Sequence, residues 1–238
     1  MLPPFSLVIP AYNEADRIAQ TLLEVLAYLQ NESPGSELIV VDDGSSDATA
    51  EVVRRVFNEA TPGIERRLIQ QPANRGKGAA VRAGLEAATR PIGLFSDADL
   101  SAPITEAPKL LGPIEAGEID VAFGSRALDR SLIGNRQVWY REQGGRVFNL
   151  LVRLATGLPF WDTQCGFKAF RLEVFRPLLA QARSDGFGFD VEFLYLARGA
   201  GLRLREIPVR WNHCEGSKLD YVRDSWRMLQ EIAELRAR

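Results

Sequence analysis

The sequence is poor in the residues that build disulfide-bonded, zinc-binding and histidine-based catalytic sites. Its 238 residues include two cysteines, Cys165 and Cys214, and one histidine, His213. Two distant cysteines imply no disulfide framework and are too isolated for a zinc site, so a reducing compartment is favoured. A Ser-His-Asp triad would depend on His213 alone, and no Gly-x-Ser-x-Gly motif accompanies it. We expect His213 to be structural rather than a metal ligand.

Long apolar runs are also missing. The longest candidates, Val147–Val152 and Leu154–Trp161, are interrupted by Arg153. They fall short of the ~20 apolar residues that a membrane-spanning helix needs. The N-terminus has neither the basic segment nor the long apolar core of a signal peptide. We therefore expect a cytoplasmic protein that is soluble or peripheral to a membrane. The net charge of −2 argues against a general nucleic-acid partner, and the sequence carries no signal for an oligomeric state.

Charge is distributed unevenly along the chain. Residues 1–120 carry 10 Lys and Arg against 18 Asp and Glu, whereas residues 121–238 carry 19 against 13. This asymmetry suggests metal or cation handling in the first half and anion binding in the second.

Apolar runs alternate with segments of helical periodicity. Strands are predicted at Phe5–Pro10, Leu38–Val41, 67–70, Ile92–Ser96 and Ile119–Gly124. Helices are predicted between them, and Asn13 is expected to cap the first. This alternation predicts a single α/β domain over residues 1–238, with a mostly parallel, Rossmann-like sheet covered by helices on both faces.

Polar clusters follow the ends of the predicted strands. They are Asn13-Glu14, Asp42-Asp43, Asp97-Ala98-Asp99 and Arg126. Ligands bind outside the carboxyl ends of strands in open α/β sheets, so these clusters are expected to converge in one site. Two carboxylates two positions apart can turn the same way and offer hard oxygen ligands to Mg²⁺ or Mn²⁺.

The ordered motifs resemble those of family 2 glycosyltransferases with the GT-A fold. They are Val8–Glu14, Val40–Asp47, Asn74–Gly78, Asp97–Asp99 and Gly124–Arg126. Three later segments resemble the dolichyl-phosphate β-glucosyltransferase branch and its bacterial polyprenyl-phosphate relatives. These are Asp162–Lys168, Phe189–Glu192 and Glu215–Leu219. The resemblance implies a nucleotide-sugar half over about 1–125 and an acceptor and membrane-facing half over about 126–238.

The resemblance implies inverting, metal-dependent transfer of a hexose, foremost glucose from UDP-glucose, to a polyprenyl or dolichyl phosphate. Asp99 would bind Mg²⁺ or Mn²⁺, and Asp97 would reach the metal or the ribose. Lys77 would meet a donor phosphate or a donor-site carboxylate. The donor pocket would be formed by Pro10, Tyr12, Asn13, Glu14, Asp42, Asp43, Gly44, Lys77 and Asp97.

The basic second half supplies candidate acceptor residues. These are Arg126, Arg136, Arg141, Lys168 and Lys218. Guanidinium groups bind phosphate bidentately. An apolar helical face of Val147, Phe148, Leu151 and Leu154 would lie in the membrane interface at the cytoplasmic face, or would pack on the sheet as an ordinary amphipathic helix.

A phosphate acceptor needs no general base, because its oxygen is already anionic at neutral pH. Asp162 and Asp190 are therefore expected to position acceptor or sugar, and Asp190 alternatively to cap the helix that follows it. Three alternatives stay open: a GDP-mannose donor, a soluble hydroxyl acceptor, and a non-catalytic binding module. The Asp97/Asp99 pair argues against the last.

Overall fold

A computed structural model describes residues 2–134, 139–212, 227, 228, 230–232, 234 and 235, with the backbone alone for 139–143, 146 and 147. The strands are β1 (Ser6–Ala11), β2 (Glu37–Asp42), β3 (Glu65–Gln70), β4 (Ile92–Ser96), β5 (Val121–Ser125), β6 (Phe167–Arg171) and β7 (Leu204–Pro208). The helices are α1 (Ile18–Glu32), α2 (Thr49–Glu59), α3 (Lys77–Ala87), α4 (Ala107–Glu115), α5 (Trp139–Thr156), α6 (Leu172–Leu179) and α7 (Phe189–Gly199).

The strands form one seven-stranded sheet in the order β3-β2-β1-β4-β6-β5-β7, to which both halves of the chain contribute. β1 pairs in parallel with β2 and β4, and β5 pairs in parallel with β7. The mostly parallel sheet is thus confirmed. β6 was not predicted, and it runs antiparallel to both of its neighbours, β4 and β5.

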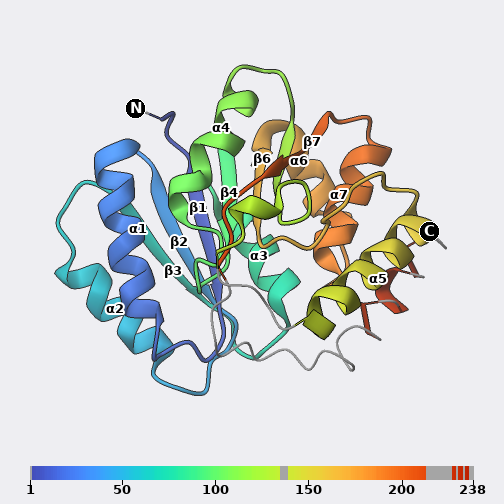
Figure 1. Ribbon diagram of the computed structural model, residues 1–238. Coiled ribbons are helices and arrows are strands. Elements are labelled where there is room, and N and C mark those ends of the chain that lie inside the picture. The colour runs from blue at the N-terminus through green and yellow to red at the C-terminus, as the bar shows by residue number, and fades with distance from the viewer. Residues whose placement is uncertain (1, 135–138, 213–226, 229, 233, 236–238) are drawn as a thin grey trace.

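Helices cover both faces of the sheet, as predicted (Figure 1). Successive residues of β1 point into different cores because side chains alternate along a strand. Leu7 and Ile9 pack in the core beneath α1, α2 and α4, whereas Val8 packs with α3, α6 and α7 on the other face. Burial on both faces explains the continuous apolar runs of the central strands.

The first helix does not use its predicted cap. α1 begins at Ile18, with Arg17 at the N-cap position and no side-chain capping bond. Asn13 instead lies in the left-handed region, with φ of 54°. Its side-chain oxygen accepts a hydrogen bond of 2.8 Å from the backbone N–H of Ser46, in the loop after β2. Asn13 therefore joins two strand-end loops, and the predicted helix cap was wrong.

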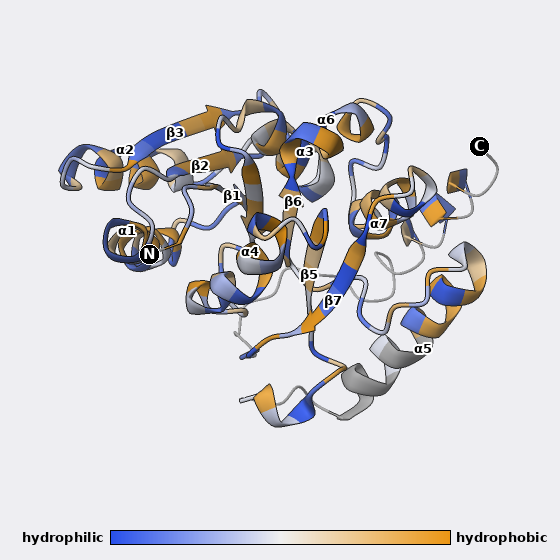
Figure 2. Cartoon of the chain, turned by 90° about the horizontal axis from the view of Figure 1, so that it is seen from above, coloured by the Kyte–Doolittle hydropathy of each residue, from blue (hydrophilic) through white to orange (hydrophobic). Residues whose placement is uncertain are grey.

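The predicted apolar face of α5 is divided. Phe148 is buried with Val152 in the core that contains α3, α6 and α7. Leu150, Leu151 and Leu154 are exposed. Figure 2 shows α5 at the edge of the molecule, beyond β5 and β7. In the described part of the chain, no helix has the length and apolar character to cross a bilayer.

Candidate functional site

The loops after β1, β2, β4 and β5 lie at one edge of the sheet because these strands are parallel. β6 is antiparallel, so the residues before it reach the same edge. The backbone N–H of Asp97 donates a 3.1 Å hydrogen bond to the carbonyl of Gly166. A strand-end loop from the first half of the chain thus meets the turn before β6 from the second half.

Asp97 is paired with Lys77, the first residue of α3. The Lys77 Nζ lies 2.5 Å from Asp97 Oδ1. Burial lowers the pKa of Lys77, but the nearby Asp97 and Asp190 carboxylates outweigh this effect and raise the pKa above its ordinary value. Asp97 is thus the carboxylate partner of Lys77 among the described residues, and contact of Lys77 with a donor phosphate stays a prediction.

The Asp97 carboxylate lies directly against Gly166. A Cβ atom added to Gly166 would collide with the carboxylate carbon and both of its oxygens. Asp99 follows on the same loop, and one of its oxygens accepts a 2.9 Å hydrogen bond from the N–H of Ser101. The loop after β4 thus carries two carboxylates at the sheet edge, and the first of them, Asp97, packs closely against Gly166.

These two carboxylates suit a hard divalent cation. Mg²⁺ is commonly bound by one or two carboxylates together with substrate phosphates, so a larger protein cage is not required. Among the described residues, no group of three His, Cys, Asp or Glu side chains is placed to hold a metal. A metal shared between Asp97, Asp99 and a phosphate-bearing ligand is compatible with these side chains and stays a prediction.

The acidic pair at the end of β2, Asp42 and Asp43, is buried and hydrogen-bonded to protein groups. Asp43 accepts hydrogen bonds from the N–H groups of Arg75 and Gly76, at 2.9 and 2.8 Å, and from the Asn74 side chain at 3.0 Å. Burial nevertheless raises the pKa of Asp43, since these bonds only partly offset it. Asp42 accepts a 3.1 Å bond from the N–H of Ser45. Asp43 thus orders the loop that leads into Lys77.

The other donor-side residues lie around this edge. Pro10 is buried in β1 and Tyr12 is exposed just after it. The N–H of Glu14 donates to Thr49, and its carboxylate pairs with Arg17 at 2.7 Å. Gly44 has a positive φ of 67°, and a side chain there would collide with the backbone of residues 73 and 74. Their contact with a nucleotide stays a prediction.

Lys168 and Asp190 form an ion pair inside the protein. Lys168 is 0% exposed, and its Nζ donates to Asp190 and, at 2.6 Å, to the carbonyl of Cys165. Burial raises the pKa of Asp190, an effect that Lys168 and Lys77 partly offset. The direct acceptor contact expected of Lys168 does not fit this burial. Lys168 instead holds the turn that presents Gly166 to Asp97.

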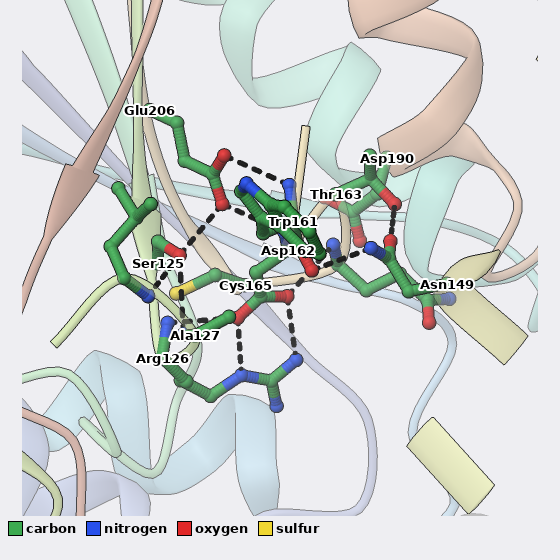
Figure 3. A network of polar contacts seen from close by, with 12 residues as sticks. Ser125, Arg126, Ala127, Asn149, Trp161, Asp162, Thr163, Cys165, Asp190 and Glu206 are labelled. Carbon is green, nitrogen blue, oxygen red and sulfur yellow. Dashed lines mark hydrogen bonds and ion pairs between the residues drawn. The ribbon is translucent and has the colours of Figure 1, made fainter. Parts of the chain in front are cut away.

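Arg126 and Asp162, both predicted to lie near the acceptor, form a second ion pair (Figure 3). The Nε and Nη2 atoms of Arg126 donate to Asp162 at 2.6 and 2.8 Å, and the Arg126 backbone N–H donates at 3.0 Å. Burial would raise the pKa of Asp162, but the charge and hydrogen bonds of Arg126 hold it below its ordinary value. Asp162 lies four residues before Gly166, which contacts Asp97, so residues 162–166 join the two ion pairs.

Two residues of this site were missed by the sequence reasoning as functional positions. Gly166 lies within the quoted Asp162–Lys168 motif, which offered a signal. Glu206 in β7 accepts hydrogen bonds from the acceptor-side loops and belongs to no motif. Arg136, Lys218 and His213 lie outside the described residues, as does the side chain of Arg141.

Solved structures with the same architecture show the fold class. Glucosyl-3-phosphoglycerate synthase from Mycobacterium tuberculosis aligns in its complex with Mn²⁺, UDP and glucosyl-3-phosphoglycerate, with a TM-score of 0.71. Its complex with Mg²⁺ and UDP aligns with a TM-score of 0.70. Both are 21% identical to this chain and cover 98% of it, and the alignments span 80% and 79% of those chains. The fold is GT-A.

The family follows from sequence comparison. Residues 6–179 match the family described as Glycosyl transferase family 2. The dolichyl-phosphate β-glucosyltransferase of Dictyostelium discoideum is 32% identical over 98% of this chain and 74% of its own length. That of Drosophila melanogaster is 39% identical over 90% of this chain and 68% of its own. The chain belongs to glycosyl transferase family 2, and it is a hexosyltransferase.

Proposed function

We propose that this protein transfers glucose from UDP-glucose to a polyprenyl phosphate of the dolichyl type, with inversion at the anomeric carbon. One observation carries the proposal. The Asp97/Asp99 loop, which is suited to a metal and a diphosphate, is joined through residues 162–166 to Arg126, a guanidinium suited to a second phosphate, because Asp97 contacts Gly166 and Arg126 binds Asp162. The names of the relatives support both the sugar and the lipid acceptor.

On the donor side, Asp97 and Asp99 would hold Mg²⁺ or Mn²⁺, which when bound stabilises negative charge on the departing nucleoside diphosphate. Lys77 adds a fixed positive charge at the same place. The loop ordered by Asp43 positions Lys77, because residues 74–76 bond to that carboxylate directly before α3 begins.

On the acceptor side, Arg126 keeps one edge of its guanidinium available. Its Nε and Nη2 are bonded to Asp162, whereas Nη1 makes no hydrogen bond to the residues that the structure describes. An acceptor phosphate bound there is already anionic, so it attacks without a general base. Asp162 orients Arg126, and Asp190 is neutralised by Lys168; neither is required to take a proton.

The surface of α5 supports a peripheral position on a membrane. Leu150, Leu151 and Leu154 are exposed on this helix, and Trp161 is 57% exposed on the following loop. The Arg153 guanidinium lies 4.2 Å from the centre of the Trp161 ring. Apolar side chains with a tryptophan and an arginine are typical of segments that lie in the interface of anionic membranes. A lipid acceptor would be reached from such a surface at the cytoplasmic face.

The decisive experiment identifies the product. Purified protein is incubated with Mn²⁺ or Mg²⁺ and either UDP-glucose or GDP-mannose, together with dolichyl phosphate, undecaprenyl phosphate or phosphoglyceric acid. Mass spectrometry should find a glucosyl phosphate lipid only when UDP-glucose and a polyprenyl phosphate are both present. Asp99→Ala should abolish this product while leaving the circular dichroism spectrum unchanged. A mannosylated lipid or a glucosylated soluble acceptor would replace the proposal with one of the alternatives.

A further inference from the structure

Glu206 is a partly buried carboxylate in β7 that faces the acceptor-side loops (Figure 3). Its Oε1 accepts hydrogen bonds from the backbone N–H of Asp162 and from the Ser125 hydroxyl, each at 2.7 Å. Its Oε2 accepts a 2.9 Å bond from the N–H of Trp161. Three donors, one from the end of β5 and two from residues 161 and 162, therefore meet on one side chain.

The sheet places Glu206 between these loops. β5 and β7 are parallel, and Glu206 pairs with Phe123 in the register. Residues two apart on a strand share a face, so Ser125 projects on the same side as Phe123, next to Glu206. The Ser125 hydroxyl also accepts bonds from the N–H groups of residues 127 and 128, at 3.2 and 3.3 Å. Glu206 thereby connects the start of the loop after β5 with the segment 161–162.

Two of the residues that Glu206 binds, Ser125 and Asp162, are connected to Arg126. The backbone N–H of Asp162 donates to Glu206, and the Asp162 carboxylate accepts hydrogen bonds from the guanidinium and the backbone N–H of Arg126. Ser125 directly precedes Arg126 in the chain. The Arg126 guanidinium also lies 5.6 Å from the centre of the Trp211 ring. Its direction is thus determined by Asp162 and Trp211, and the position of Asp162 is determined by Glu206.

We propose that Glu206 is a positioning residue for the acceptor phosphate. It fixes the 161–162 segment so that Asp162 holds one edge of Arg126 and leaves the other edge open. This inference rests on the proposed function, because it takes Arg126 to bind the phosphate of the lipid acceptor. Glu206 itself does not contact the substrate.

The chemistry requires a carboxylate at this position. Three donors converge on two oxygen atoms, and an ionised carboxyl accepts at both of them. A glutamine of the same shape has one oxygen and one NH₂ group, so it would turn a donor toward either the Trp161 N–H or the Asp162 N–H. Glu206→Gln therefore removes the anchor with a minimal change in volume.

The test compares Glu206→Gln with Glu118→Gln. Glu118 is an exposed glutamate that pairs at 2.9 Å with the exposed Arg205, the neighbour of Glu206 in β7, so it is a control for the same substitution beside β7, before the start of β5 rather than after its end. Glu206→Gln should raise the KM for polyprenyl phosphate by about tenfold, the effect of weakening a hydrogen-bonded charge contact. The KM for UDP-glucose should stay unchanged. Ser125→Ala, which leaves both amide bonds to Glu206, should raise the acceptor KM less.

A double-mutant cycle separates positioning from a general loss of stability. Glu206→Gln placed in an Arg126→Ala background should cause little further rise in the acceptor KM, because both changes act through the same guanidinium. Additive effects, an unchanged acceptor KM, or equal rises in the acceptor and donor KM would overturn the inference and leave the proposed function standing. If the wild-type protein forms no glucolipid, both the proposed function and the inference about Glu206 are overturned.

Discussion

The ammonium of Lys77 lies 2.5 Å from Oδ1 of Asp97, although 20 residues separate them along the chain. Lys77 opens α3, and Asp97 follows the last residue of β4. Asp190 and Asp99 add to the negative potential around the same ammonium. This lysine therefore neutralises the acidic loop on which a divalent cation would bind.

Replacing Lys77 with methionine should make the protein less stable but more responsive to metal. The change leaves Asp97 and Asp190 without a shared counter-charge and should lower the free energy of unfolding by about 1–3 kcal/mol. A bound cation then relieves more repulsion than in the wild type, so the rise in melting temperature on adding Mn²⁺ should be larger. Thermal melts with and without Mn²⁺ measure this directly. Equal Mn²⁺ shifts in the two proteins would contradict the role given to Lys77.

Gly166→Ala should damage the site through a single methyl group. The added Cβ would collide with the Asp97 carboxylate, which must then move from its present position beside Lys77. We expect at least a tenfold loss of activity, since displacement of a reacting group by about 1 Å costs about 10²-fold. Gly199→Ala, at the end of α7 where an added Cβ meets nothing within 4 Å, is the matched control and should keep full activity. Retention of full activity by Gly166→Ala would show that the close contact between Gly166 and Asp97 is unimportant.

The exposed leucines of α5 provide a test of membrane binding. Leu154 is 71% exposed, and Leu151 is exposed on the same helix. Changing both to serine should reduce binding to anionic lipid vesicles by at least tenfold, because burial of one leucine side chain contributes about 1.5–3 kcal/mol. Vesicle co-flotation measures the bound fraction. Leu23→Ser removes an exposed leucine from α1 and should leave binding unchanged; a similar loss in both variants would mean that α5 has no special role.

The stability contributed by the Arg126–Asp162 pair should depend on pH. The pKa of Asp162 in the folded protein lies below its ordinary value of 3.8, so the ionised carboxyl stabilises the fold above about pH 4. This contribution disappears as the pH falls through the lowered pKa. Asp162→Asn should therefore cost about 2–4 kcal/mol at neutral pH, where it leaves Arg126 unpaired. Urea unfolding should show the difference from the wild type narrowing below pH 4, and a difference independent of pH would contradict the pairing.

The sequence predicts the central part of the fold well because its signals are local. Strand β4 was predicted with its observed bounds, since five apolar or small residues end directly at Asp97. β6 was missed because Lys168 interrupts its apolar pattern, and β7 because Arg205 and Glu206 make it look like a surface segment. Their pairing depends on strands far away in the chain.

In the site too, residues with local sequence signals could be predicted and residues that depend on distant parts of the chain could not. The Asp97/Asp99 pair and Lys77 could be proposed from short motifs whose residue types already indicate their chemistry. Lys168 was misjudged because a lysine is normally exposed, and its burial depends on Asp190, 22 residues later. A role for Glu206 could not be proposed from the sequence. Its neighbours along the chain do not indicate that it accepts three hydrogen bonds from β5 and the 161–162 segment.

Because β6 runs antiparallel to its neighbours, residues from two separate stretches of the chain form this edge of the sheet. The loops that follow β1, β2 and β4 come from the first hundred residues, whereas the turn that enters β6 comes from the second half. One place where the two stretches meet is the contact of Asp97 with Gly166. On the proposed function, residues 126–164 can therefore vary to suit another acceptor while the loops that would hold the nucleotide-sugar are preserved, as long as the contact between Asp97 and Gly166 is kept.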